Sequence, residues 1–322
     1  MANSWISMVM GALRGKVADS GSPSRLAVVP ESVDLPGGPA VDPRLARYGE
    51  LARVARLDRL YLVLSFDCDT DEDIPAAEIF SGELARRGIR ATFAVPGIQL
   101  RRGAATYRRL AEEGAEFMNH GALPHAEWRD TRYYSITFYS EMTREAVVED
   151  MHAGHRIVED VTGRTPMGFR APHFGCFQAP EQLELLYDTA RGLGYRYCST
   201  TIPDCALTRG PFYDAGGLWE VPLFGSFRYP PTLLDSWTYL SSYERYALKD
   251  EYYELFEETV RRLTEERIPG LLSLYVDPAH VVGQAPFLRA LDVIRDRGVP
   301  SLQFRDVVAL AERDASAGAA GN

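Results

Sequence analysis

Lysine is nearly missing from this sequence, and basic residues are fewer than acidic ones. Lys16 and Lys249 are the only lysines, so arginine supplies nearly all of the 35 basic residues, against 45 acidic ones. We attribute the arginine bias to the base composition of a GC-rich bacterial genome. The net charge of −10 argues against nucleic acid and anionic membrane as partners, because both bind clustered Lys and Arg. A neutral substrate, or one that leaves as a cation, fits better.

The sequence also lacks a long apolar run and paired cysteines, and we expect no signal peptide. No run approaches the roughly 18 apolar residues of a membrane span. The segment Trp5–Met10 is short, follows no cationic residue and shows no convincing cleavage site. The four cysteines (Cys68, Cys176, Cys198 and Cys205) form no CxxC motif, which is typical of reduced thiols. We therefore expect a cytoplasmic protein.

What the sequence does contain is a regular alternation of strand and helix patterns. An arm rich in Ser, Pro and Gly runs from Gly21 to about Pro43 and leads into a helix over 42–57. Strands are then expected at 60–66, 91–95, 115–119, 168–171, 195–199, 218–223, 270–276 and 301–304. Helices are expected at 76–87, 106–113, 140–161, 181–193, 250–266, 286–297 and 305–312. Such alternation predicts an α/β fold with a mostly parallel sheet, and about seven units of this kind can close into a barrel.

The first predicted strand ends in two carboxylates, Asp67 and Asp69. Alternate side chains of an extended chain share a face, so both carboxylates point the same way and Cys68 points oppositely. Two carboxylates placed together repel each other unless a cation or a shared proton lies between them. This arrangement suits a metal-dependent hydrolase, with one carboxylate as ligand and the other as general base. A solvated acidic loop is the alternative.

Further strand ends carry polar or aromatic groups that a core does not need. They are Asn119-His120 through His125, Arg170-Ala171-Pro172-His173, Trp219-Glu220, and Asp277 through His280. The carboxyl ends of parallel strands meet at one end of a barrel, and catalytic sites of such barrels lie there. The combination favours a catalytic site over the acidic loop.

This set of motifs resembles the polysaccharide deacetylase family, the NodB-homology group of carbohydrate esterases, over roughly residues 60–310. The resemblance implies a distorted (β/α)7-type barrel at 58–314, with an N-terminal extension (arm plus helix) at 1–57 and a flexible tail at 315–322. It also implies that Asp67 is catalytic and that Asp69 binds a metal. The common form of the motif has adjacent aspartates, whereas Cys68 separates them here. Cys68 as a thiolate ligand stays an alternative, although alternation turns it away from the site.

The second motif of the family supplies two metal-binding histidines separated by three residues. His120 and His125 are separated by four, which on one helix would place them about 140° apart. The glycine and proline between them instead predict a loop that brings both rings together. The resemblance therefore implies that Asp69, His120 and His125 hold a divalent ion, most readily zinc, with Co2+, Mn2+ or Ni2+ as alternatives. If His125 is not a ligand, water or Glu127 completes the set.

The residues from Arg170 onward match the third motif. In the family this arginine orients the catalytic aspartate, here Asp67, through a charge-assisted hydrogen bond; a structural ion pair is the alternative. The resemblance also assigns Pro172 and His173 to substrate binding. It assigns Trp219 to the wall that receives the acetyl methyl, where core packing explains the tryptophan nearly as well.

The fifth motif departs from the family. Members usually end this strand with a histidine that protonates the leaving amine, whereas Asp277 stands in that register and His280 follows. We assign the acid role to His280, and the alternative is an Asp277 that restrains His173. His152 and His155, one turn apart on a predicted helix, are more typical of a solvated helix surface than of a zinc site.

We therefore predict a metal-dependent hydrolase that cleaves a C–N amide bond and releases acetate from an N-acetylated amino sugar or glycan precursor. The sugar follows from the resemblance alone. Relatives on the same fold that open cyclic ureides or imides make a small-molecule amidohydrolase the first alternative, and a non-catalytic binding protein is the second. Whether the chain forms a homo-oligomer through its N-terminal arm stays open.

Overall fold

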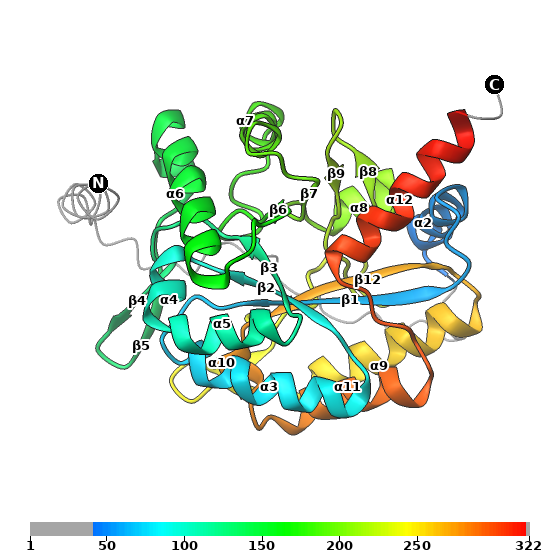
Figure 1. Ribbon diagram of the computed structural model, residues 1–322. Helices are drawn as coiled ribbons and strands as arrows, with labels where there is room; N and C mark the ends of the chain where they lie inside the picture. Colours follow the sequence, from blue (N-terminus) through cyan, green and yellow to red (C-terminus); the bar gives the residue numbers. More distant parts are fainter. Residues whose placement is uncertain (1–40, 320–322) are drawn as a thin grey trace. The chain divides into compact units, whose positions relative to one another are not determined.

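A curled, mostly parallel sheet forms the centre of the chain in the computed structural model, which describes residues 41–319 (Figure 1). Its strands are β1 (Leu60–Asp67), β2 (Ala91–Val95), β3 (Glu116–Asn119), β6 (Gly168–Phe169), β7 (Tyr197–Cys198), β8 (Tyr213–Asp214), β9 (Trp219–Glu220) and β12 (Gly270–Val276). The spatial order is β12-β1-β2-β3-β6-β7-β9-β8. Every neighbouring pair is parallel except β8 with β9.

The two edges of the parallel part of this sheet approach each other beyond β9. The chain there continues alongside β7, since Val221 N–H donates to the Cys198 carbonyl at 2.8 Å. Phe224 N–H then donates to the Ser273 carbonyl of β12, also at 2.8 Å. Within the described residues, seven parallel strands curl round so that the two edges of the sheet come near each other. The hydrogen bond from Phe224 to Ser273 connects these edges. The predicted distorted (β/α)7-type barrel is confirmed.

Helices and two small antiparallel pairs fill the connections. The helices are α2 (Pro43–Val54), α3 (Asp73–Arg87), α4 (Gly97–Arg102), α5 (Ala104–Glu112), α6 (Arg144–Thr162), α7 (Pro180–Gly192), α8 (Pro203–Arg209), α9 (Asp250–Glu265), α10 (Pro278–Val281), α11 (Ala285–Asp296) and α12 (Phe304–Ala319), with a short 3-10 turn at Tyr139–Glu141. The antiparallel pairs are β4 (Ala126–Arg129) with β5 (Arg132–Ser135), and β10 (Leu240–Ser242) with β11 (Ala247–Leu248). None of the described helices is long and apolar enough to cross a membrane.

Two predicted elements differ clearly from the structure. The long helix was expected to begin at Ser140, but α6 begins after Thr143, whose hydroxyl caps it by accepting a hydrogen bond from Ala146 N–H at 3.2 Å. The strand expected at 301–304 is reduced to one bridge between Ser301 and Leu62, because α12 starts at Phe304. The hairpin β4–β5 was not predicted.

Helix α2 packs against the outer edge of the sheet and belongs to the same compact unit as the barrel. The Tyr48 hydroxyl donates to the Leu271 carbonyl at 2.9 Å and accepts from Leu271 N–H at 2.8 Å. The phenol therefore satisfies the N–H and the carbonyl of Leu271 in β12, as a neighbouring strand would. The arm of the predicted extension lies outside the described residues, and so do residues 320–322 of the predicted tail.

The core lies on both sides of the sheet. One buried cluster packs β1, β2, β3 and β12 against α2 and α12, and includes Val63, Ala94, Met118 and Phe304. A second packs β6 and β7 against α6 and α7, and includes Phe169, Met151 and Leu186. Strand β1 is buried along nearly its whole length, which is expected for a strand inside a parallel sheet. Asp67, the last residue of β1, is therefore held by a rigid element.

Candidate active site

Two parallel strand ends place the predicted aspartates and histidines together. Asp67 is the last residue of β1, and Asp69 follows it. Asn119 ends β3, and its side chain accepts a hydrogen bond from Gly121 N–H at 3.0 Å while it donates to the Met151 carbonyl at 2.8 Å. These bonds fix the turn that carries His120 away from the strand.

Arg170 is fully buried and binds Asp67. Its Nη1 donates to Asp67 Oδ1 at 2.5 Å and to the Ser65 hydroxyl at 2.7 Å. Its other nitrogens donate to the carbonyl and the hydroxyl of Ser199 at 3.2 and 3.0 Å. All of its nitrogens therefore have partners, and one oxygen of Asp67 is held in a fixed direction.

Asp69, His120 and His125 form the one group of potential metal ligands within the described residues, and their ligand atoms all lie within 4.8 Å of one another. His120 Nε2 lies 3.6 Å from Asp69 Oδ1 and 3.8 Å from Asp67 Oδ2. His125 Nδ1 lies 3.1 Å from Asp69 Oδ1. The extra residue in the loop between the histidines is thus accommodated, and their ring centroids are 4.4 Å apart.

The chemistry of this donor set fits a divalent metal ion. His120 Nδ1 lies 2.8 Å from the Arg170 carbonyl, which fixes its proton on Nδ1 and leaves the Nε2 lone pair facing the carboxylates. Burial lowers the pKa of His120 to about 4. Burial and the neighbouring His173 lower the pKa of His125 well below its usual range. Both rings are therefore neutral near pH 7, which is the form that binds metal.

Asp150 of α6 holds the loop between the two histidines. Its Oδ1 accepts from Ala122 N–H at 3.0 Å and from Leu123 N–H at 2.9 Å, and its Oδ2 accepts from the Tyr139 hydroxyl at 2.7 Å. Gly121 has φ +73°, and a Cβ there would lie 2.2 Å from Asp150 Oδ2. The loop therefore needs glycine at this position and a carboxylate beneath it. Sequence reasoning missed Asp150, which carried no motif.

Burial disfavours the ionised forms of Asp67 and Asp69 at the end of β1. It raises the pKa of Asp67, although the Arg170 guanidinium and His120 pull that pKa down. It also raises the pKa of Asp69, again against an opposing effect of His120. Both carboxylates are thus in an environment that favours a nearby cation.

A second group of buried acids lies at the end of β12. Asp277 Oδ2 accepts from Trp237 Nε1 at 2.7 Å, and its Oδ1 is buried with no hydrogen-bond partner among the described residues. Asp73 Oδ1 accepts from Ala279 N–H at 2.8 Å, which ties the start of α3 to the segment after β12. Sequence analysis gave Asp73 no role. It missed Trp237, which lies in an irregular stretch without periodicity.

His280 is enclosed behind Asp277. Its Nδ1 lies 3.1 Å from the Ser236 hydroxyl and 3.7 Å from Asp277 Oδ2. The rings of Trp237 and Tyr246 pack on it, with centroids 4.5 and 4.6 Å away. Burial lowers the pKa of His280 to about 3, so the ring is neutral near pH 7.

His173 lies beside the metal-ligand group. It has φ +57°, a strained conformation for this residue type, and its Nε2 donates to the Ile136 carbonyl at 2.6 Å. Its ring centroid lies 5.8 Å from that of His125. Pro172 is buried next to it in the chain. The structure thus brings His173 to the site that the sequence predicted, but it shows no bond between His173 and Asp277.

Other sequence candidates lie elsewhere. Trp219 packs against Phe212 and the core cluster that includes Val63 and Phe304, as the core-packing alternative describes. Cys68 is not part of the group of potential metal ligands; its thiol faces Tyr107, and burial raises its pKa well above its usual range. Glu127 is paired with Arg129 at 2.9 Å on the surface. His155 Nδ1 lies 3.0 Å from the Tyr195 hydroxyl.

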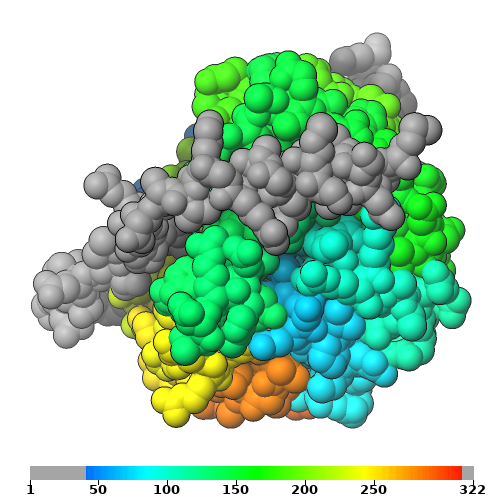
Figure 2. Space-filling model, turned by 90° about the vertical axis from the view of Figure 1, so that its left-hand side faces the viewer, coloured from blue at the N-terminus to red at the C-terminus, as the bar shows by residue number. Residues whose placement is uncertain are grey.

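Exposed aromatic side chains lie on segments next to the site. The hairpin β4–β5 follows His125 directly and carries Trp128, 50 % exposed, and Tyr134, 37 % exposed. Arg132 lies over the rings of Tyr134 and Tyr243, at 4.5 and 5.7 Å. The face in Figure 2 shows this hairpin (green) beside the residues that follow β1 (blue). These rings could stack on the apolar faces of sugar rings.

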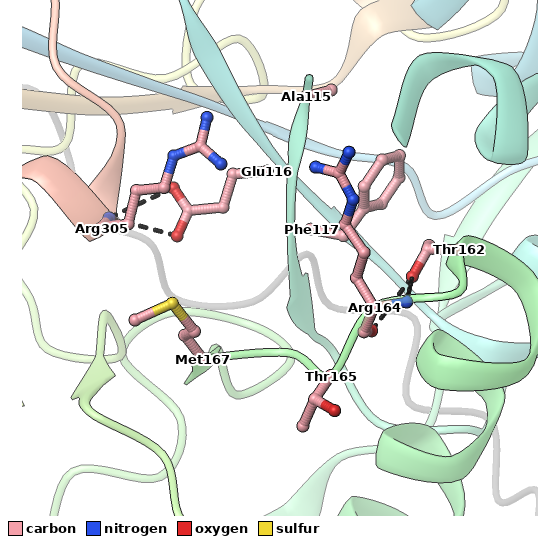
Figure 3. A pocket seen from close by; sticks show the side chains of 8 residues that line it. All are labelled: Ala115, Glu116, Phe117, Thr162, Arg164, Thr165, Met167 and Arg305. Atoms are coloured by element: carbon pink, nitrogen blue, oxygen red, sulfur yellow. Dashed lines mark hydrogen bonds between the residues drawn. The ribbon is translucent and has the colours of Figure 1, made fainter. Parts of the chain in front are cut away.

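A cavity of about 90 Å3 lies at the opposite end of β3 (Figure 3). Its lining includes Glu116, Met167 and Arg305. Glu116 is already bound, since its carboxylate accepts from the Tyr197 hydroxyl at 3.0 Å, the Thr92 hydroxyl at 2.9 Å and Arg305 N–H at 3.1 Å. This cavity lies at the wrong end of the strand for the barrel's reacting groups.

Comparison with known proteins agrees with this geometry. Residues 58–197 match the family model of polysaccharide deacetylase. The resemblance to the polysaccharide deacetylase family is confirmed. The match includes the motifs of Asp67, His120 and Arg170, whereas the departing motif of Asp277 lies beyond it. No curated protein sequence matches the chain.

Solved structures of polysaccharide deacetylases share the fold. A Mycobacterium smegmatis protein assigned to that class is 16 % identical, with a TM-score of 0.58 over 81 % of this chain and 92 % of that one. A Pseudomonas aeruginosa protein of the same class is 14 % identical, with a TM-score of 0.54 over 79 % and 91 %. A family 4 carbohydrate esterase pseudoenzyme from Bacillus anthracis is 12 % identical, with a TM-score of 0.48 over 78 % and 66 %. At these identities the likeness to the first two structures shows the fold alone.

Proposed function

We propose that the chain is a metal-dependent amide hydrolase that removes the acetyl group from an N-acetylated amino sugar or glycan precursor. One observation carries the proposal. A carboxylate and two neutral imidazoles converge within 4.8 Å, and a second carboxylate beside them is held by a buried arginine at 2.5 Å. The match to the family model of polysaccharide deacetylase supports deacetylation in general. The metal dependence and the sugar are our inference.

Asp69, His120 and His125 would hold the ion, most readily zinc, with Co2+, Mn2+ or Ni2+ as alternatives. When bound, such an ion supplies a Lewis acid that makes water more acidic and polarises the acyl oxygen. The protein keeps both histidines neutral and orients His120 through the Arg170 carbonyl. The ligand set is therefore prepared by the fold.

Asp67 acts as the general base in this proposal. Its Oδ2 faces the metal-ligand group, 3.8 Å from His120 Nε2, while its Oδ1 is bound by Arg170. The guanidinium favours the ionised carboxylate, which is the form that can accept a proton from attacking water. Asp67 accepts that proton as the new C–O bond to the acyl carbon forms. His173 and Pro172, beside the ligand group, contribute to substrate binding.

The exposed rings of Trp128, Tyr134 and Tyr243 support a sugar substrate, because they lie on the segments next to the site. The burial of the reacting groups favours the second candidate, a compact cyclic amide or imide, since His120 and His125 are almost completely covered. The four free cysteines support a reducing compartment such as the cytoplasm.

The test combines a metal assay with product analysis. Purified protein would be incubated with N-acetylated sugars and with cyclic amides, while acetate release and ring opening are measured. We expect acetate from the sugars, together with about one equivalent of bound metal. His120→Ala should lose bound metal and turnover together, whereas His152→Ala on the surface of α6 should keep both. A protein that binds sugar but cleaves none of these amides would be a non-catalytic relative, contrary to the proposal.

A further inference from the structure

The proposed hydrolysis leaves one step without a residue. When the C–N bond breaks, its electron pair goes to nitrogen, and an unprotonated amide anion is a very poor leaving group. A group near Asp67 must therefore donate a proton. The family places a histidine in this register, and this chain has Asp277 there with His280 two residues beyond Pro278.

The sheet register places Asp277 next to Asp67. Phe66 of β1 pairs with Val276 of β12, so the following residues, Asp67 and Asp277, leave neighbouring parallel strands side by side. Alternation gives Asp277 the same face as Tyr275. The Tyr275 ring lies 5.9 Å from the Arg170 guanidinium that holds Asp67. Both aspartates therefore face the interior of the barrel where the metal-ligand group lies.

The contacts of Asp277 leave one oxygen available. Its backbone N–H donates to the Ser236 hydroxyl at 3.1 Å, and its Oδ2 accepts from Trp237 at 2.7 Å. Its Oδ1 is buried and unpartnered among the described residues. A buried polar atom without a partner calls for an explanation, and a proton donor that meets the substrate nitrogen only in the complex supplies one.

His280 is less suited to the step. Its Nδ1 is taken by Ser236, and its ring is enclosed by Trp237 and Tyr246. It is also neutral and hard to protonate, because burial lowers its pKa to about 3.

Resting on the function proposed above, we propose that Asp277 is the general acid and that it donates its carboxyl proton to the departing nitrogen. The carbon–nitrogen bond breaks, the nitrogen takes the electron pair and this proton, and Asp277 becomes a carboxylate. The proton that Asp67 accepted from water then restores Asp277. The sum is amide plus water giving carboxylic acid plus amine.

The electrostatic surroundings agree with a protonated Asp277. Burial, followed by the charges of Asp73, Asp69 and Asp67, holds its pKa well above its usual range. Trp237 is the opposing partner, since its N–H favours the ionised form. His280, the remaining titratable group against it at 3.7 Å, is neutral. An aspartic acid that stays protonated can donate a proton at neutral pH, as a histidinium does in other enzymes.

The test compares substrates that do and do not need the proton. Asp277→Asn would be assayed on N,N′-diacetylchitobiose, whose amine must be protonated, and on 4-nitrophenyl acetate, whose nitrophenolate leaves unaided. We expect amide turnover to fall at least about 100-fold and ester turnover to stay within about threefold. His280→Asn tests the rival candidate for the acid and should lower amide turnover less than tenfold, whereas His152→Ala on α6 is the control and should change neither activity. Bound metal and the melting temperature report that each variant folds.

A second variant tests the hydrogen bond on Asp277. Trp237→Phe removes a donor that favours the ionised form, so it should move the alkaline limb of the kcat profile to higher pH. Equal loss of amide and ester turnover in Asp277→Asn, or full retention of both, would overturn the acid role. A wild-type protein that cleaves the ester but no amide would overturn the proposed function itself, a result distinct from either.

Discussion

Arg170 shows how one residue couples stability to chemistry. It is completely buried, and its charge is balanced by Asp67 at 2.5 Å. Removing one partner of a buried pair leaves the other uncompensated, at a cost of about 3–5 kcal/mol. The residue therefore supports the fold and the reactive state of Asp67 together.

We expect Arg170→Gln to slow amide hydrolysis at least about 100-fold and to change its pH dependence. The guanidinium lowers the pKa of Asp67, and the base acts in its ionised form. Loss of the cation raises that pKa, so the acid limb of kcat/KM should move to higher pH. Arg170→Lys keeps the charge and should shift the limb less. An unmoved acid limb in Arg170→Gln would contradict Asp67 as the base.

Asp150 makes the free energy of unfolding depend on pH, and a substitution at this position isolates its contribution. Burial raises its pKa to about 6 from the ordinary 3.8. Between these values the folded protein binds more protons than the unfolded chain, so this group makes the protein more stable as the pH falls from 7 to 5, by about 1 kcal/mol. Asp150→Asn keeps an oxygen for the N–H groups of Ala122 and Leu123 but does not titrate.

Chemical unfolding at pH 7 and pH 5 measures this effect. The stability change between the two pH values should be less favourable in Asp150→Asn than in wild type by about 1 kcal/mol. Equal changes in the two proteins would show that Asp150 is ionised throughout this range.

At the scale of elements, α6 approaches β3 closely only because it contains Gly154. A Cβ there would lie 2.2 Å from Asn119 Oδ1 and 2.7 Å from the Gly121 carbonyl. Gly154→Ala improves helix propensity by about 1 kcal/mol, but overpacking against fixed backbone costs about 1–3 kcal/mol. We expect a net loss in unfolding free energy and weaker metal binding, since the turn before His120 shifts.

Gly192 at the end of α7 is the matched control, since a Cβ there meets no atom within 4 Å. Gly192→Ala should raise the unfolding free energy by about 0.5–1 kcal/mol and leave metal affinity unchanged. Isothermal titration with Zn2+ and urea unfolding provide both readouts. A Gly154→Ala protein that binds metal like wild type would contradict the role assigned to this contact.

The hairpin β4–β5 offers a test of the substrate. Trp128 is half exposed and its ring lies 5.1 Å from that of Tyr133. If the Trp128 ring stacks on a sugar ring, the contact contributes about 1 kcal/mol to substrate binding. Trp128→Ala should then raise KM for diacetylchitobiose about fivefold or more and leave kcat unchanged. A cyclic amide substrate should show no such effect. Exposed Ile79→Ala on α3 is a suitable control.

The hairpin also shows where sequence reasoning ends. Strand β1 could be predicted because an apolar run of buried-strand length stops at charged residues. The strands β4 and β5 have mixed polar and aromatic residues and are only partly buried, so no periodicity marks them. Trp237 and Asp150 reach the site through tertiary packing. That Asp69 and His120 lie close together was predictable, because both follow the ends of parallel strands; their role as metal ligands stays a prediction.

For the whole molecule, the alternation of strands and helices predicted the barrel but not how its edges are completed. Phe224 and Ser273 meet through backbone atoms, and no side-chain pattern reports that. The division at residue 57 was drawn from the resemblance, whereas α2 packs with the barrel through Tyr48.

Tyr48→Phe tests this packing. The change leaves the N–H and carbonyl of Leu271 without their phenol, and buried unpaired groups cost about 1–3 kcal/mol each. We expect the melting temperature to fall by several degrees while kcat stays unchanged at 25 °C. Tyr61→Phe removes an exposed bond to Asp58 and should change stability by less than about 0.5 kcal/mol. Equal melting temperatures for the two variants would refute the role of Tyr48.

The position of that phenol has a consequence for solubility. An uncovered outer strand offers its row of amides and carbonyls to any other chain, and intermolecular strand addition begins there. Helix α2 shields β12 with a side chain that satisfies both groups of Leu271. A shortened chain that starts at residue 58 should therefore assemble into aggregates through this edge, even with every reacting residue intact.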